Sequence, residues 1–404
     1  MLLAKSPLSL ADVVNFAIER NPSLKASEAR WNAAKTKSVQ ANTLEDPILS
    51  VNRMKEMGDN KTGLMISQKI PWSGRLDLQG KVAEQEARIA EQEFVTQRFT
   101  LIARTKSAYY DLFWVNQVIR INQEIKEIIS NTEKITELQY ATGHASGRSA
   151  VADKGSQQDI LKARIEFARI DNEISIWERV KETAAVNLNR YLNRSASAFL
   201  GTPTELTIKP LKLSLDQLTQ LALEHNPELK TAGLEIDKNK KLTELAHKQS
   251  YPDFTISAEY DRFSNLSNGL SNKNGWAGGI GINIPLWREK YQAAVREAEA
   301  QTRASEHNQQ SARNDTSFAI KDIHIRTLNA WKVVELYQNN LIPQAEQLLA
   351  ASQASYQTGK MNFLNVLDSS RMLLALKLGL YQAQVDYKKA LAELESVCAS
   401  VIEE

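Results

Sequence analysis

The sequence predicts a mainly α-helical chain that carries a small amount of membrane-type β-structure, built from two copies of one unit. Glycine (16) and proline (10) are sparse among the 404 residues, which favours long uninterrupted helices. The stretch LSLADVVNFAIERNPSLKA, which begins at Leu8, returns as LSLDQLTQLALEHNPELKT at Leu213. Between the helical stretches, short runs alternate apolar and polar residues, as half-buried strands do. These three observations predict the fold class.

The two copies lie 205 residues apart in the chain. This offset places Asn21-Pro22 on Asn226-Pro227 and Pro47 on Pro252. A period of that length is too long for a solenoid repeat and indicates duplication of a whole unit. We therefore expect a first structural repeat over 1–205 and a second over 206–404.

Each copy is expected to begin with two helices. The first is short and amphipathic, with Val13 and Ala17 on its apolar face, and the Asn-Pro step ends it because a residue before proline avoids the helical region. The second helix starts at that proline, which suits the first helical position. It stops before Pro47 in one copy and before Pro252 in the other.

A hairpin, a long helix, a turn and a returning helix are expected next in each copy. Each of the two long helices would span roughly 100 Å at 1.5 Å per residue. In the first copy the turn holds about ten extra residues, HASGRSAVAD. The expected ranges are hairpins at about 47–72 and 252–286, long helices at about 75–142 and 288–358, and tip turns at about 143–155 and 359–361.

The hairpin strands have the length and alternation of membrane-barrel strands. Phe254, Ile256 and Tyr260 share one face of their strand, and the residues between them are small or polar. Four strands cannot close a barrel, whereas three chains would supply twelve. Tryptophans at the hairpin ends fit the interfacial belt of a membrane protein: Trp72, Trp276 and Trp287. A small soluble sandwich with an aromatic core is the competing interpretation of the strands alone.

Composition and motifs exclude several classes of function. The net charge of +2 offers no basic footprint for nucleic acid, and no apolar run approaches the 18 residues of a membrane-spanning helix. With no phosphate-binding loop, dinucleotide turn or nucleophile elbow, we expect no enzymatic activity and no cofactor. The only cysteine is Cys398, so neither a disulfide within the chain nor a cysteine-based zinc site is possible.

Metal-binding residues show no convincing pattern. The five histidines are scattered, and no pair has the spacing of a helical metal site, so no metal site is predicted. Met54, Met57 and Met65 gather around the first hairpin, where thioethers could contact a soft metal ion. Packing on the strand face, or a position in a loop, is the simpler interpretation. The first five residues are too short for a signal peptide, so we expect either a cytosolic chain or one whose signal has been removed.

Several motifs resemble the TolC-like outer-membrane efflux channel family over essentially the whole chain. They are ISQKIPWSGRL, YATG followed by GSQQDILKARIE, and YQTGKMNFLNVLDS, set in the duplicated helix–hairpin–helix plan. QKIPWSGRL is most similar to the branch that serves heavy-metal or cation efflux pumps. The resemblance implies a homotrimer with a 12-stranded barrel in the outer membrane above an α-helical barrel in the periplasm. It also implies partners, namely a periplasmic adaptor and an inner-membrane pump of the RND type, with outer-membrane lipid around the barrel and no nucleic acid.

The resemblance also assigns roles to residues at the turns. It implies an aperture built by Asp159, Asn365 and Asp368, a latch drawn from Tyr140, Tyr356 and Lys360, and adaptor-docking tips at Gly143 and Gly359. Two positions depart from the family pattern. Met361 stands where a basic latch residue is common, and Asn365 replaces an expected acid.

Two alternatives stay open at this stage. A duct of the same family could serve drug efflux or type I protein secretion instead of metal cations. A soluble, structural coiled-coil protein with small β modules is the alternative from another functional class.

Overall fold

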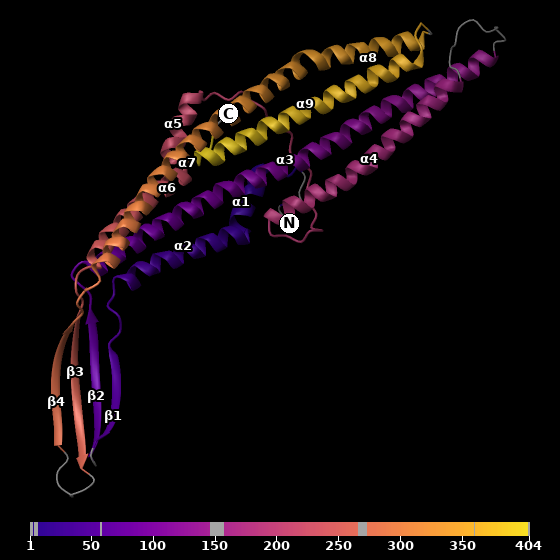
Figure 1. The fold of residues 1–404 in the computed structure, drawn as a ribbon. Coiled ribbons are helices and arrows are strands. Elements are labelled where there is room, and N and C mark those ends of the chain that lie inside the picture. The colour runs from indigo at the N-terminus through magenta and orange to yellow at the C-terminus, as the bar shows by residue number, and fades with distance from the viewer. Residues whose placement is uncertain are drawn as a thin grey trace. The chain divides into compact units, whose positions relative to one another are not determined.

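A computed structural model describes residue 3 and residues 7–56, 59–145, 157–265, 273–358 and 360–402 (Figure 1). The fold is mainly helical with one antiparallel sheet, as the sequence predicts, and its elements occur twice in the same order. The first series is α1 (Leu10–Arg20), α2 (Pro22–Ala41), β1 (Ile48–Glu56), β2 (Asp59–Ile70), α3 (Arg75–Ala145) and α4 (Gln157–Tyr191). The second is α5 (Leu215–His225), α6 (Pro227–Lys248), β3 (Phe254–Asn265), β4 (Lys273–Ile282), α7 (Arg288–Leu336), α8 (Ile342–Gln357) and α9 (Phe363–Cys398).

The chain divides into two compact units, and each unit draws on both sequence repeats. Unit 1 comprises Met1–Lys25, Thr96–Asn226 and Asp315–Glu404, and unit 2 comprises Ala26–Val95 and Pro227–Asn314. Helices α3 and α7 each contribute residues to both units. No helix of the described residues has an apolar stretch suited to crossing a membrane.

Unit 2 contains a four-stranded antiparallel sheet in the order β1-β2-β3-β4 (Figure 1). Its register aligns apolar residues in rows across the strands, and one such row joins Val51, Leu64, Tyr260 and Trp276. A second row joins Leu49, Ile66, Ala258 and Gly278. Residues opposite one another across a pair share a face, so one side of the sheet is apolar. Its large side chains are exposed: Leu49 63%, Val51 68%, Ile280 82% and Trp276 81%.

The opposite face of the sheet is polar. Ser67 pairs with Ser257, and the row through Gly63 contains Asn52 and Asp261. The Lys61 ammonium lies 2.8 Å from the Asp261 carboxylate on this face. The alternation of the sequence therefore corresponds to two faces with different surroundings.

The strand ends meet at Asp253, whose side chain is only 6% exposed. Its carboxylate accepts hydrogen bonds from the Trp72 backbone N–H at 3.2 Å and from Arg75 Nη1 at 2.6 Å. Gly74 adopts a φ of +80°, a left-handed value that lets the chain turn from β2 into α3. β4 ends at Ile282 rather than near 286, and Pro285, which has no N–H to donate to a ladder, follows three residues later.

Polar residues line the contact between α6 and α7 in unit 2. Asn239 Nδ2 donates to Ser305 Oγ at 2.6 Å, and both residues are buried. One turn further along, the Thr243 and Thr302 hydroxyls lie 3.2 Å apart. Paired hydrogen bonds satisfy these groups, which explains how a stretch almost free of large apolar residues packs against another helix.

Unit 1 packs around three clusters of apolar side chains. One joins α3, α4, α8 and α9, another surrounds α1, and the third surrounds α5. The short helices α1 and α5 bury equivalent residues, Val13 and Ala17 in one and Leu218 and Ala222 in the other. The amphipathic pattern predicted for both helices is thus directed into a core.

The Asn-Pro steps make the same contact in both repeats. Asn21 Nδ2 donates to the Tyr191 carbonyl at 2.9 Å, and Asn226 Nδ2 donates to the Val397 carbonyl at 2.9 Å. Both asparagines are buried, and each caps the end of its short helix by donating its backbone N–H to a carbonyl of that helix, Ala17 or Ala222. Each thereby ties the end of a short helix to the last turn of a long one.

The helix expected over 288–358 contains a π-helical turn at Tyr337–Leu341. Pro343 follows this turn as the second residue of α8, and proline has no N–H to donate to the preceding turn. A π-turn accommodates that loss while the helix continues. The Tyr337 ring lies so close to Gly379 of α9 that a Cβ at position 379 would come within 2.7 Å of it.

Candidate functional site at the ends of the long helix pairs

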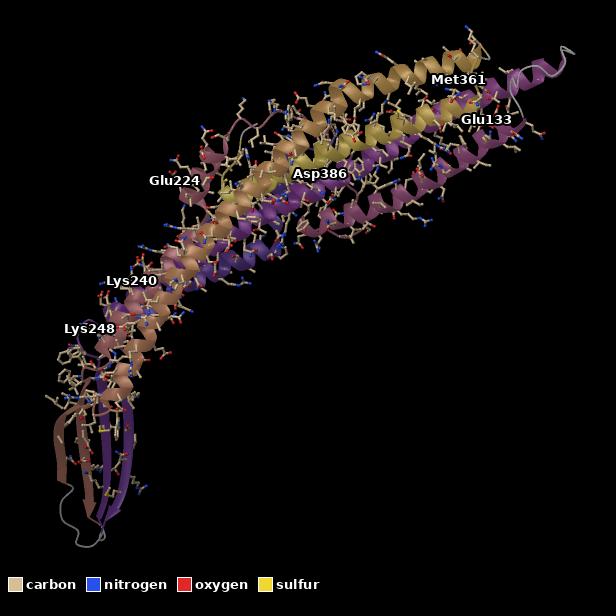
Figure 2. All side chains as sticks on the ribbon, turned by 45° about the horizontal axis from the view of Figure 1, so that its top comes forward. Glu133, Glu224, Lys240, Lys248, Met361 and Asp386 are labelled. Carbon is tan, nitrogen blue, oxygen red and sulfur yellow. The ribbon has the colours of Figure 1, made fainter. Side chains whose placement is uncertain are left out.

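In unit 1, α3 pairs with α4 and α8 pairs with α9, and the turns implied to form an aperture follow α3 and α8 (Figure 1). Residues 146–156 and Gly359 lie outside the described part of the chain. The Asn362 side chain caps α9 by accepting from the Asn365 N–H at 3.3 Å, so the start of α9 is fixed locally. In Figure 2 the labels Met361 and Glu133 mark the end of unit 1 where these turns connect the long helices.

Tyr356 of α8 is buried against α3. Its hydroxyl lies 2.6 Å from Thr136 Oγ1, and the Thr136 hydroxyl itself donates to the Thr132 carbonyl at 2.8 Å. A threonine has one hydroxyl hydrogen, so Tyr356 is the donor in this pair. The pKa of Tyr356 is raised above its ordinary value, chiefly by burial and further by the negative charge of Asp159.

Asp159 and Tyr356 are brought together, whereas the α9 residues lie in solvent. Asp159 is only 8% exposed and sits 3.8 Å from Lys162 Nζ, one turn along α4. The Asp368 side chain is 72% exposed and lies 4.0 Å from an Arg371 guanidinium nitrogen. Asn365 is also exposed. Of the three implied aperture residues, Asp368 and Asn365 are therefore open to solvent in the single chain.

The other implied tip residues are placed only in part. Lys360 is exposed, and its backbone N–H donates to the Ser355 carbonyl at 2.9 Å. Tyr140 lies in α3, but its side chain is outside the described set. Gly143 lies within α3, which runs on to Ala145, so the helix extends past the point where a turn was expected.

A buried carboxylate next to this region has no counterpart among the predicted site residues. The Glu166 side chain of α4 is 3% exposed and binds two guanidinium groups. Arg371 of α9 donates to it at 3.1 and 2.7 Å, and Arg169 donates at 2.6 and 3.2 Å. Burial alone would raise the pKa of Glu166, but the bonds from Arg371 and Arg169 hold that pKa below its ordinary value. In the sequence, only the pairing of Glu166 with Arg169, three residues later on the same helix, could be recognised.

The three predicted interfacial tryptophans all belong to unit 2. Trp72 stacks on Tyr251 and Phe254, with ring centroids 5.2 and 5.9 Å away. Trp276 packs at 4.8 Å from the Tyr260 ring on the apolar face of the sheet, and Trp287 is 76% exposed. Trp276 lies within β4, Trp72 stands two residues beyond β2, and Trp287 stands directly before α7.

Metal-ligating side chains do not converge in the part of the chain that the structure describes. No three histidine, cysteine, aspartate or glutamate residues gather there as a metal site. Met54 is 58% exposed on β1, and Met57 falls outside the described residues. Cys398 is buried in a core cluster, where burial raises the pKa of its thiol to about 11.

Two curated proteins resemble this chain over nearly its full length. It is 21% identical to the cobalt-zinc-cadmium resistance protein CzcC of Cupriavidus metallidurans, over 98% of this chain and 90% of that protein. It is also 21% identical to the outer membrane protein TolC of Vibrio cholerae, over 98% of this chain and 92% of that protein.

Solved structures and a family model agree with these similarities. CusC, whose structures were described in terms of transmembrane channel formation, superposes with a TM-score of 0.80 at 17% identity, covering 97% of this chain and 92% of that one. The family model described as outer membrane efflux protein matches residues 13–194 and 218–400. Both sequence repeats are matched, and the chain belongs to the outer membrane efflux protein family.

Proposed function

We propose that the protein is one subunit of a homotrimeric duct that carries heavy-metal cations out of a Gram-negative cell. The single observation that carries the choice of substrate is the similarity to CzcC, which extends over 98% of the chain. In this proposal an inner-membrane pump of the RND type and a periplasmic adaptor supply the cargo. The duct is passive and performs no chemistry on the cargo.

The sheet supports the trimer because it is incomplete in one chain. β1 and β4 are its edge strands, and their outer edges pair with no strand of the described residues. Unpaired edges and a large exposed apolar face are unstable in water. Three copies of the four strands would pair edge to edge into twelve, an even number, with the apolar face toward lipid.

The aperture is proposed at the turns of unit 1. Asp368, exposed at the start of α9, would recur three times around the threefold axis and attract cations. Asp159 is mostly covered by its own chain, so we expect it to act on Tyr356 more than on passing ions. Gly143 and Gly359 would meet the adaptor in this arrangement.

Growth of a deletion strain tests the choice of cargo. Loss of the gene is expected to sensitise cells to cobalt, zinc and cadmium salts but not to dyes or bile salts, and a plasmid copy should restore resistance. The opposite pattern would assign the duct to drug export, in line with the similarity to TolC. No sensitivity to either group, in a strain with an intact pump and adaptor, would contradict an export role.

Substitutions at the turn test the aperture. Asp368→Asn is expected to reduce the cation preference of single channels more than Asp159→Asn does, because the first carboxylate is exposed and the second is covered. Asn365→Asp should increase that preference by adding a charge one turn away. Equal reversal potentials in all three variants and the parent protein would remove Asp368 from the aperture.

A further inference from the structure

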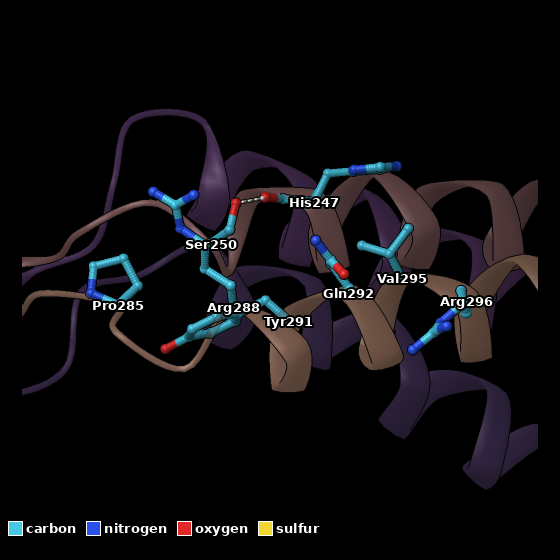
Figure 3. Close-up of a pocket in the computed structure, with 8 residues that line it drawn as sticks. All are labelled: His247, Ser250, Pro285, Arg288, Tyr291, Gln292, Val295 and Arg296. Carbon is cyan, nitrogen blue, oxygen red and sulfur yellow. Dashed lines mark hydrogen bonds between the residues drawn. The ribbon is translucent and has the colours of Figure 1, made fainter.

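Unit 2 contains a cationic pocket where α6 ends and α7 begins (Figure 3). Its volume is about 640 Å³. The side chains around it are basic, polar or apolar, and none is acidic: His247, Ser250, Pro285, Arg288, Tyr291, Gln292, Val295 and Arg296. The pocket therefore offers positive charge and hydrogen-bond donors without an internal anion.

The two arginines of the pocket are not neutralised by neighbouring acids. Neither Arg288 nor Arg296 forms an ion pair or a side-chain hydrogen bond within the described residues. The positions four residues before them are Ile284 and Gln292, both uncharged. Elsewhere the chain does use such partners, as in the Arg88–Glu84 pair at 2.6 Å and the Arg326–Asp322 pair at 2.9 Å. Their guanidinium groups thus remain available to an external anion.

The spacing of the arginines suits a bulky anionic group. They lie eight residues apart on α7, or about 12 Å along a helix. Figure 3 shows Arg288 and Arg296 toward opposite ends of the pocket, with Tyr291 and Gln292 between them. Val295 and Pro285 add apolar surface next to these polar groups. Arginine forks bind phosphate oxygens in bidentate fashion, so a phosphate beside an apolar body matches the lining.

The position of the pocket in the chain identifies the source of such a phosphate. Its residue Pro285 stands three residues after β4, next to large apolar side chains that are mostly exposed in the single chain: Ile284 70%, Leu286 70% and Trp287 76%. Exposed tryptophan beside arginine is typical of the boundary between lipid tails and headgroups. A ligand held here would be level with phospholipid headgroups if the sheet spans the membrane.

We propose that this pocket binds the headgroup of an anionic phospholipid in the periplasmic leaflet of the outer membrane. The proposal rests on the proposed function, because the sheet must lie in that membrane. Free inorganic phosphate shares the chemistry of the headgroup and is the alternative source. Bound lipid would hold the start of α7 at a fixed depth next to the end of β4.

Two other pockets supply a contrast and a control. One, which contains Arg88 and Lys240, also contains Glu91 and Asp237, so its charges are mixed. The other, in unit 1, contains Arg104 and Arg190 and no acid. There, however, Arg190 donates to the Tyr191 hydroxyl at 2.8 Å and covers the Tyr191 ring at 4.7 Å. Substituting Arg104 and Arg190 removes the same charge far from β4 in the sequence.

Native mass spectrometry of the full-length protein in detergent tests the proposal with phosphatidylglycerol as the probe. Arg288→Gln with Arg296→Gln is expected to weaken phosphatidylglycerol binding about tenfold or more. Arg288→Lys with Arg296→Lys should retain most of the binding, because the charges remain. The control pair, Arg104→Gln with Arg190→Gln, should bind as the parent protein does.

Two results would overturn the proposal. One is equal phosphatidylglycerol binding by the Gln pair and the parent protein. The other is displacement of the lipid by inorganic phosphate at equal concentration, which would assign the pocket to a free anion. Conductance in planar bilayers distinguishes failure of the lipid-binding proposal from failure of the proposed function. A Gln pair that conducts normally but binds lipid like the parent contradicts the pocket alone, whereas a parent protein that never inserts contradicts the proposed function.

Discussion

The two compact units hold their helices together by different physical means. In unit 1, three apolar clusters contain side chains that are almost completely buried, among them Phe113, Ile170 and Phe363. All three clusters lie within unit 1. In unit 2, the contact between α6 and α7 is made by polar side chains, among them Asn239 on Ser305 and Thr243 on Thr302. The large apolar side chains of the unit 2 sheet point outward instead.

This difference separates the part of the chain that supplies its own core from the part that needs a cover. Apolar burial contributes about 25 cal/mol per Å² removed from water, so unit 1 gains most of its stability within the single chain. The apolar face of unit 2 gains nothing until lipid or another copy covers it. Unit 1 should therefore respond strongly to truncation of one side chain, and unit 2 weakly.

Matched phenylalanines in the two units give the largest expected difference. Phe113 is 1% exposed in a core cluster of unit 1, whereas Phe94 of unit 2 is half-buried and stacks on Trp31 at 5.6 Å. Phe113→Ala should lower the free energy of unfolding by about 3–5 kcal/mol, from lost burial and the cavity left behind. Phe94→Ala should cost about half as much or less. Urea unfolding in detergent measures both, and equal losses would contradict the division.

The Glu166 site gives the next largest effect. Arg371→Ala removes one of two guanidiniums from a carboxylate that is 3% exposed. Losing a partner of a fully buried charge costs about 3–5 kcal/mol, and the half-exposed arginine reduces this to about 2 kcal/mol. A double-mutant cycle with Glu166→Gln measures the coupling between the two side chains. A coupling energy near zero would show that the pair is incidental.

The same site predicts a pH dependence. The pKa of Glu166 in the folded protein lies below its ordinary value of 4.5. Glu166 therefore contributes its full share to the free energy of unfolding above the pKa that it has in the unfolded protein. This contribution is lost as pH falls through the pKa that it has in the folded protein. Between about pH 5 and about pH 3, the parent protein should lose more stability than Glu166→Gln does. Parallel losses in the two proteins would mean that other carboxylates dominate acid unfolding.

Close packing at the π-turn gives a smaller effect. Gly379→Ala places a Cβ within 2.7 Å of the Tyr337 ring and should cost about 1–2 kcal/mol by overpacking. Adding Tyr337→Ala removes the clash. Tyr337→Ala should therefore lower the free energy of unfolding less in the Gly379→Ala protein than in the parent protein. Thermal unfolding of the three variants checks this. Strict additivity of their effects would rule out the contact.

The polar contact of unit 2 gives the smallest effect. Asn239→Ala removes the 2.6 Å bond to Ser305, whose hydroxyl keeps its bond to the Gln301 carbonyl at 3.1 Å. The expected loss is about 1 kcal/mol, the net value of one hydrogen bond. A loss as large as that for Phe113→Ala would show that polar contacts stabilise the helices as strongly as apolar ones do.

Local patterns in the sequence were enough to locate the helices and strands. Alternation of apolar and polar residues located the hairpins, and the Asn-Pro steps located the ends of α1 and α5. Membership of the efflux family followed from motifs in both repeats, which the family model also matches. The division into two units did not follow, because each unit joins stretches from both repeats.

Contacts between distant residues explain what sequence patterns missed. Glu166 and Arg371 are 205 residues apart, on α4 and α9. No sequence motif around either residue predicts contact with the other. Asp253 belongs to no motif recognised in the sequence, yet it binds Trp72 and Arg75 of the other repeat. The π-turn before Pro343 also went unseen, since a helix that continues on both sides keeps its periodicity.

Single-channel recording of the purified protein in planar bilayers tests the central claim most directly. Under a salt gradient, we expect discrete conductance steps whose reversal potential indicates cation preference. Asp368→Asn should shift that potential toward zero. A protein that stays monomeric without detergent and produces no steps, at any protein concentration or voltage, would contradict the assignment of this chain as a subunit of a cation-exporting duct.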